Sequence, residues 1–286
     1  MPVCEVPEAW AAIPDRAARP GTTVILVGGS DAGKTTLGLW LAQRLGEGGL
    51  RVGVVDADVG QSRLGPPATI GWAWGAGGRP VAVRFAGDIT PSGAESRCLA
   101  ATALCTAEAR QAGADVVLCD TTGWVSGPGA LDYKLAKTDL LHGSLCLLLE
   151  REGELQPYRR ALRGRAGVEV IAVPSAAAAR VRSPEDRRAR RRRAFAAHLA
   201  GVLEVELDLH TVGVAGLPLL RERSLLGLLG ADGRLLALGL AGALDRRAGT
   251  LACLAPAAGA GAAQVVVGRI ALDEEFGESR GSEIEQ

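Results

Sequence analysis

Short apolar runs alternate with helical stretches over the first two thirds of the chain. The runs are rich in Val and Leu and show no polar alternation, which is typical of parallel strands buried on both faces. The pattern predicts strands at 22–27, 51–55, 81–85, 115–119, 145–149 and 168–173. Helices are expected near 34–45, 94–112 and 131–140, and a long loop is expected after the second strand. This alternation predicts an α/β fold with a mostly parallel, doubly wound sheet.

The pattern changes after Gly201. Short apolar runs separated by Gly or Asp-Gly turns predict a small C-terminal β domain, with a hairpin turn at 231–234. Before it, Pro184 opens an arginine-rich helix that is expected to end near Gly201. The predicted organisation is a lead segment at 1–20, a P-loop domain at 21–200 that includes the arginine helix, and a β domain at 201–272. An acidic tail at 273–286 is expected to be disordered.

Composition narrows the class of protein. Among the 286 residues, 32 Lys and Arg balance 32 Asp and Glu, so no overall charge indicates a nucleic-acid or membrane partner. The basic residues are nevertheless concentrated, because residues 180–193 hold eight arginines and two acids. The six cysteines form no C-x-x-C pair, which favours buried free thiols in a reducing compartment. No signal peptide and no 18-residue apolar span is present, so we expect a cytoplasmic protein without membrane contact.

A glycine-rich turn joins the first strand to the first helix. The sequence fits G-x-x-x-x-G-K-[ST] at Gly28, Gly33, Lys34 and Thr35. Backbone N–H groups of such a turn, with the helix N-terminus, hold the phosphates of a nucleoside triphosphate; the lysine reaches the β- and γ-phosphates and the hydroxyl binds Mg²⁺. The predicted nucleotide-binding residues are Gly28, Gly29, Ser30, Asp31, Ala32, Gly33, Lys34, Thr35 and Thr36.

Aspartates follow two other predicted strands. Asp56 and Asp58 end the second strand, and Asp120 ends the strand at 115–119. Because the carboxyl ends of parallel strands line the ligand crevice, these carboxylates are expected to face the triphosphate. One of the first pair could organise Mg²⁺ through water and the other could accept a proton, although both could also be turn-forming residues. Thr35, Asp56 and Asp120 are the predicted Mg²⁺ residues.

Three segments together resemble the polynucleotide 5′-hydroxyl kinases of RNA processing, most closely the compact archaeal type. They are the P-loop, the run Asp56-x-Asp58-Val-Gly60-Gln61, and the run Asp120-Thr-Thr-Gly-Trp-Val. The resemblance implies that Asp58 is the catalytic base and that Gln61 lies near the phosphate acceptor. It also implies a "clasp" that holds the terminal nucleotide, formed by Thr122, Gly123 and Trp124, and a substrate loop that contains Thr90.

The arginine helix matches the family's lid pattern R-S-x-x-x-R-x-x-x-R at Arg182, Arg187 and Arg191. Arg187 and Arg191 are four residues apart and share a helix face, and Arg182 precedes the helix. The guanidinium groups of a lid can neutralise charge on a transferring phosphoryl group. The resemblance therefore implies that Arg182 contacts the nucleotide and that Arg187 and Arg191 are catalytic. A solvated face or a non-specific nucleic-acid patch is the alternative.

The sequence thus predicts an ATP- and Mg²⁺-dependent kinase that phosphorylates the 5′-hydroxyl of RNA or DNA, with Lys34 neutralising developing charge. The rival is a switch-type P-loop ATPase or GTPase that drives protein association or metal insertion. No Asn-Lys-x-Asp run that would read guanine is present, which counts against a common GTPase. Only 20 residues precede the first strand, so a protein partner bound through the larger members' N-terminal β domain is not expected.

Overall fold

The computed structural model describes residues 7–174 and 182–280, and the chain groups into two compact units. The first unit comprises Met1–Asp58, Ile70–Val81 and Thr90–Arg182. The second comprises Val59–Thr69, Ala82–Ile89 and Ser183–Gln286.

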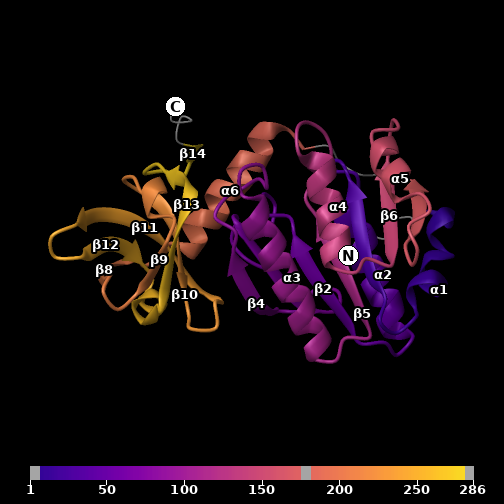
Figure 1. Cartoon of the computed structure of the whole chain (residues 1–286), viewed down its shortest axis with the longest axis horizontal. Helices are drawn as coiled ribbons and strands as arrows, with labels where there is room; N and C mark the ends of the chain where they lie inside the picture. The colour runs from indigo at the N-terminus through magenta and orange to yellow at the C-terminus, as the bar shows by residue number, and fades with distance from the viewer. Residues whose placement is uncertain (1–6, 175–181, 281–286) are drawn as a thin grey trace. The chain divides into compact units, whose positions relative to one another are not determined.

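A seven-stranded sheet organises the α/β part, in the order β4-β3-β2-β5-β1-β6-β7 (Figure 1). The pairs β2–β5, β5–β1, β1–β6 and β6–β7 are parallel, while β3 runs antiparallel to β2. The strands are β1 (Thr23–Gly28), β2 (Val52–Ala57), β3 (Thr69–Trp74), β4 (Pro80–Phe85), β5 (Val116–Thr121), β6 (Leu145–Glu150) and β7 (Glu169–Pro174). The prediction of a mostly parallel, doubly wound sheet is confirmed.

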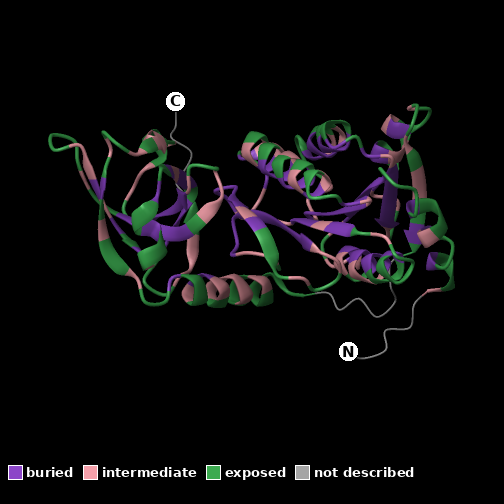
Figure 2. Cartoon of the chain, turned by 90° about the horizontal axis from the view of Figure 1, so that it is seen from below, coloured by how far each residue is buried: buried purple, intermediate pink, exposed green. Residues whose placement is uncertain are grey.

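Helices cover both faces of this sheet because the central strands are apolar on both sides. Val24 and Leu26 of β1 pack with Leu37 and Leu41 of α2 (Lys34–Glu47) in one core. Trp10 of the 3₁₀ turn η1 (Glu8–Trp10) and the short helix α1 (Ile13–Ala17) close the same core. The helices α3 (Glu95–Gln111), α4 (Ala130–Leu140) and α5 (Gln156–Leu162) complete the unit. Buried residues concentrate on the strands and exposed residues on the outer sides of the helices (Figure 2).

The second unit contains an antiparallel sheet of order β14-β13-β10-β11-β12-β8, with β9 parallel to β13. The expected turn at 231–234 joins β10 to β11 as an antiparallel hairpin. The strands are β8 (Leu203–Asp208), β9 (Gly213–Ala215), β10 (Ser224–Leu229), β11 (Leu235–Asp245), β12 (Thr250–Ala255), β13 (Gln264–Leu272) and β14 (Glu278–Arg280), with 3₁₀ turns η2 (Leu217–Leu219) and η3 (Ala257–Gly261). The predicted C-terminal β domain is therefore present.

The arginine helix groups with the β domain rather than with the P-loop domain. Helix α6 (Pro184–His198) begins with a capping box between Ser183 and Asp186, as Pro184 at the first turn favours. Phe195, near the end of α6, is fully buried in a core of the second unit with Leu225 and Ile270. This apolar contact moves the boundary between units from the expected position near 200 to Arg182.

Three other segments can be compared with their sequence expectations. The loop after the second strand contains β3, which the Gly- and Pro-rich surroundings concealed. The lead segment is packed, since Trp10 and Ile13 are buried in the first core. The acidic tail is structured as far as Arg280, because β14 pairs with β13; residues 281–286 lie outside the described residues.

The cysteines match their prediction. Cys98, Cys105, Cys119, Cys146 and Cys253 are free and buried, and Cys4 lies outside the described residues. Burial raises the pKa of the Cys119 thiol to about 11, which leaves it protonated and unreactive near neutral pH. Over the described part of the chain, no helix is long and apolar enough to cross a membrane.

Candidate functional site

The P-loop follows β1 and gives way to α2 at Lys34. Gly33 caps the helix in the left-handed conformation at φ 92°, which favours glycine. The Lys34 side chain is buried, and its ammonium donates to the carbonyl oxygens of Gly28 at 2.9 Å and Gly29 at 2.7 Å. The Lys34 ammonium is therefore held within its own loop, and its role in binding phosphate stays a prediction.

Thr35 and Asp120 are joined directly. The Thr35 hydroxyl donates to Asp120 Oδ2 at 2.5 Å, while Asp120 Oδ1 is buried and has no hydrogen-bond partner within the residues described. Burial raises the pKa of Asp120, and Lys34 and the Thr35 hydrogen bond lower it in part. A hydroxyl beside a carboxylate with an unused buried oxygen is the donor set that a P-loop Mg²⁺ needs, so these residues fit that ion.

Asp56 and Asp58 occupy the same edge of the sheet. Asp56 pairs in register with Asp120 across β2 and β5, and its Oδ1 accepts the backbone N–H of Asp58 at 3.2 Å. Asp58 is half-buried, and its charge contributes to the pKa shifts of Asp120 and Lys134. Asp56 and Asp120 are thus neighbours where the parallel strands β2 and β5 end, and Asp58 follows Asp56 by two residues. In the described ranges no three His, Cys, Asp or Glu residues gather as a metal site.

The segment after β5 lies against the P-loop. A Cβ placed on Gly123 would be 2.4 Å from Ser30 Oγ and 2.6 Å from Ser30 N, so only glycine allows this approach of the two backbones. Trp124 is half-buried, and its ring centroid is 5.6 Å from that of Tyr133 on α4. Thr122 is buried. The segment Thr122–Gly123–Trp124, predicted as the clasp, therefore lies next to the P-loop, and Trp124 is partly exposed.

Three further side chains reach this region: Arg182, Arg151 and Lys134. Arg182, predicted to contact the nucleotide, donates from its backbone N to Asp31 Oδ2 at 3.0 Å and from its guanidinium to Asp31 Oδ1 at 3.1 Å. Arg151 donates to the Asp31 carbonyl at 2.5 Å. Lys134 donates to the segment after β5. Arg151 follows β6, which lies next to β1, so only the strand order could have revealed it.

The remaining predicted residues are placed as follows. Thr90 is half-buried in the first unit, shortly before α3. Gln61 belongs to the second unit, and its side-chain amide donates to the Gly60 carbonyl at 2.8 Å. Arg187 and Arg191 also belong to the second unit. Arg191 forms an ion pair with Glu278 in which both side chains are nearly buried, 13% and 10% exposed. The pair ties α6 to β14.

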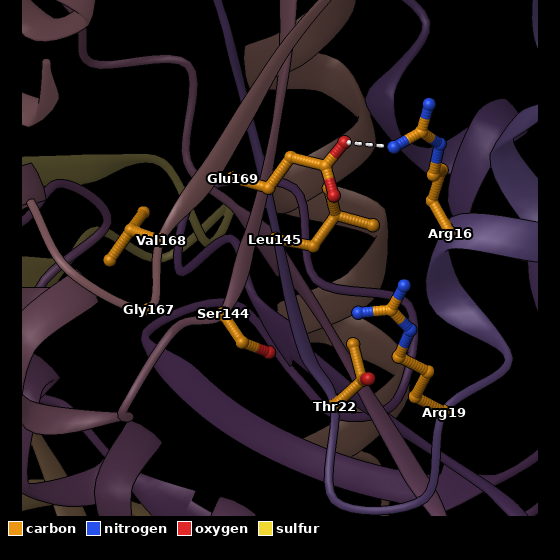
Figure 3. Close-up of a pocket in the computed structure, with 8 residues that line it drawn as sticks. All are labelled: Arg16, Arg19, Thr22, Ser144, Leu145, Gly167, Val168 and Glu169. Carbon is orange, nitrogen blue, oxygen red and sulfur yellow. Dashed lines mark hydrogen bonds and ion pairs between the residues drawn. The ribbon is translucent and has the colours of Figure 1, made fainter. Parts of the chain in front are cut away.

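A cavity of about 490 Å³ lies at the opposite edge of the parallel sheet (Figure 3). Its lining comes from residues at the amino ends of β1, β6 and β7, whereas the P-loop follows a carboxyl end. Arg16 and Glu169 form an ion pair across it, with side chains 58% and 42% exposed. This cavity is open and contains none of the predicted site residues.

These features define a P-loop nucleotide-binding protein. A glycine-rich loop joins β1 to α2 and holds a buried lysine, and a Thr–Asp pair lies at the carboxyl edge of a mostly parallel sheet. Residues 28–201 match the model of the family described as mRNA cleavage and polyadenylation factor CLP1 P-loop. The chain belongs to this family.

Curated relatives are similar over part of the chain. A polyribonucleotide 5′-hydroxyl-kinase of Pyrococcus horikoshii is 41% identical over 142 residues, which are 47% of this chain and 39% of the relative. One of Methanocaldococcus jannaschii is 35% identical over 151 residues, covering 49% and 41%. The matched region thus spans about two fifths of these relatives' length.

Solved structures extend the likeness in fold. The structure of the wild-type Clp1p–Pcf11p complex matches 90% of this chain and 76% of its counterpart with a TM-score of 0.66, at 11% identity. A second structure, described as an extended interface between Pcf11p and Clp1p, matches with a TM-score of 0.63 at 12% identity. At this identity the similarity concerns the fold.

Proposed function

We propose that this chain is a polynucleotide 5′-hydroxyl kinase that transfers the γ-phosphate of ATP to the 5′-end of RNA, and that DNA ends are accepted as well. The observation that carries the proposal is the contact of the Gly123 backbone with Ser30, beside a half-buried Trp124. The switch alternative gives this aromatic side chain no role. A kinase of polynucleotide ends gives it one, because a terminal base can stack on it whatever its identity. The matched relatives, which are named polyribonucleotide 5′-hydroxyl-kinases, support this direction.

Phosphoryl transfer depends mainly on positioning and electrostatics. The P-loop amides and Lys34 hold the β- and γ-phosphates, and Arg182 lies next to the same loop through Asp31. Thr35 would hold Mg²⁺ together with Asp120, to which it is bonded, and Asp56, which pairs with Asp120. The bound ion would neutralise charge on the phosphates.

The acceptor is aligned by the clasp residues Thr122, Gly123 and Trp124, with Gln61 and Thr90 contributing to the polynucleotide side. The 5′-oxygen attacks the γ-phosphorus, the bond from that phosphorus to the β–γ bridging oxygen breaks, and ADP leaves. The hydroxyl proton passes to the Asp58 carboxylate. We assign the stabilisation of the equatorial oxygens to Arg187 on the lid pattern of the sequence, and Arg191 is paired with Glu278.

The test is an end-labelling reaction. The protein is incubated with ATP labelled at the γ-phosphate and an equimolar mixture of 5′-hydroxyl and 5′-phosphate RNA, and in parallel with the same DNA sequences. The proposal predicts label on the 5′-hydroxyl strands alone. Lys34→Ala protein, purified in the same way, controls for a contaminating kinase. Label that appears only as free phosphate would support the switch instead.

A further inference from the structure

Lys134 is a buried charge with a definite structural task. Its side chain, on α4, is 3% exposed. Its ammonium donates to the Thr121 hydroxyl at 2.8 Å and to the Thr122 carbonyl at 2.6 Å. Burial, with the nearby charges of Lys137 and Lys34, lowers the pKa of Lys134 well below its ordinary value. A position that only filled space would not carry this cost, since an apolar side chain of similar size would pack there without it.

The hydrogen bonds of Lys134 continue into the P-loop strand. Thr121, which accepts from Lys134, donates its own hydroxyl proton to the Leu26 carbonyl at 2.7 Å. Leu26 lies two residues before Gly28, where the P-loop begins. One ammonium therefore connects α4, the end of β5 and the end of β1.

The adjacent residue on α4 holds the other end of the clasp. Tyr133 packs against Trp124, so Tyr133 and Lys134 together fix both sides of the Thr122–Gly123–Trp124 segment. Gly123 lies between these two anchors and contacts Ser30. The segment has no regular secondary structure of its own, and its described hydrogen bonds to side chains come from Lys134.

We propose that Lys134 is a positioning residue: its ammonium holds the clasp against the P-loop in the arrangement that receives the 5′-terminal nucleotide. This inference rests on the proposed kinase function for its consequence, but not for its geometry. A lysine suits the task because its three N–H donors can serve a hydroxyl and a carbonyl at once.

Lys137 provides a matched control. It lies on the same helix three residues later, is also fully buried, and its ammonium has no hydrogen-bond partner among the described residues. Its charge lies over the Tyr133 ring, 4.7 Å from the centroid. Lys134→Met and Lys137→Met thus each remove one buried ammonium from α4, while only Lys134→Met removes bonds to the clasp.

The experiment compares the two variants in two ways, well below their melting temperatures. Hydrogen–deuterium exchange of peptides covering 121–127 reports the position of the clasp without any need for activity. Steady-state kinetics with 5′-hydroxyl RNA and ATP reports whether the clasp contributes to RNA binding.

We expect Lys134→Met to exchange faster in this segment and to raise the KM for RNA about ten-fold, with the KM for ATP within two-fold of wild type. Lys137→Met should match wild type in both measurements. In a double-mutant cycle, Lys134→Met should add little to the effect of Trp124→Ala on the KM for RNA, because both act through the same segment.

Unchanged exchange in Lys134→Met would overturn the positioning role, whatever the activity. Faster exchange with an unchanged KM for RNA would overturn the link between the segment and the acceptor. If the wild-type protein transfers no phosphate to RNA, the proposed function fails, while the exchange comparison still decides the geometric part.

Discussion

The two edges of the parallel sheet carry charged residues of very different character. At the carboxyl edge Lys34, Asp120 and Lys134 are buried and joined to their neighbours by short hydrogen bonds. At the amino edge there is an open cavity, and the ion pair between Arg16 and Glu169 that lines it is exposed. Burying charge costs free energy, and a fold keeps such groups where a ligand or a structural bond uses them. Buried, hydrogen-bonded charge therefore favours the carboxyl edge as the candidate site.

The largest expected effect comes from the acceptor side of the carboxyl edge. Asp58→Asn should lower the rate of transfer by roughly 10²–10⁴, the range for a positioned base, with little change in ATP affinity. Single-turnover transfer and nucleotide binding, measured separately, check this. A variant that keeps most of its activity would make Asp58 structural and turn attention to Asp56.

Variants of the arginine helix test whether the residues at the carboxyl edge of the first unit are sufficient for phosphoryl transfer. Arg187→Ala should lower kcat by about 10²-fold, because it removes one donor to the transition state. Arg191→Ala should chiefly destabilise the second unit, by about 1–3 kcal/mol, because Glu278 is left without its partner.

Kinetics and thermal melting of both variants separate these roles. Lysine at position 187 should rescue poorly, since it lacks the planar fork of donors. If Arg187→Ala loses only RNA affinity and recovers at high RNA concentration, α6 is a binding patch.

Trp124 measures how much the clasp contributes to binding the acceptor. Trp124→Ala should raise the KM for the oligonucleotide about ten-fold through lost stacking and leave the KM for ATP unchanged. The melting temperature should stay near that of wild type, because the ring is only half-buried. A drop in melting temperature that accounts for the lost activity would show a core tryptophan.

A substitution of Lys137 tests whether a buried charge without hydrogen bonds contributes to activity. It is fully buried but makes no hydrogen bond in the part of the chain that the structure describes, and burial lowers its pKa. Lys137→Met should therefore raise stability by about 1 kcal/mol at neutral pH without loss of activity.

The stability advantage of Lys137→Met should depend on pH, because protonation of Lys137 is linked to folding. Because the pKa of Lys137 is lower in the folded than in the unfolded chain, the unfolded chain binds more protons between the two values. The free-energy cost of burying the Lys137 charge is largest below the pKa of the folded chain. It shrinks as the pH rises towards the pKa of the unfolded chain. The advantage of Lys137→Met in denaturant unfolding should accordingly fall with increasing pH, and an advantage that grows with pH would contradict the explanation.

The smallest effect is expected at the amino edge. Arg16→Ala breaks an exposed ion pair, which contributes less than about 1 kcal/mol. Both transfer kinetics and the melting temperature should be nearly those of wild type. A clear loss of activity would mean that the amino-edge cavity takes part in function and that the contrast between the edges is wrong.

The sequence predicted the residues whose chemistry is local. The P-loop, Asp56, Asp58 and Asp120 can be predicted as site residues from the sequence because each lies where a continuous apolar strand ends, and parallel strands end at one edge. β3 was missed because an antiparallel strand among Gly and Pro residues shows no strong apolar run.

Residues that depend on tertiary order could not be found in this way. Arg151 reaches the P-loop only because β6 lies beside β1. The partner of Arg191 was also hidden, since the acidic stretch that provides Glu278 was expected to be disordered. In each case a contact far along the chain, rather than a local pattern, decides the role.

The proposed kinase function requires that ATP turnover is coupled to a 5′-hydroxyl end. The most direct test measures, in the same reaction, the ADP formed and the phosphate incorporated into RNA, first without RNA and then with increasing 5′-hydroxyl RNA or its 5′-phosphate counterpart. The account predicts that ADP and incorporated phosphate rise together, one for one, with 5′-hydroxyl RNA only. ADP formation that proceeds equally without RNA, with free phosphate as the product, would contradict it.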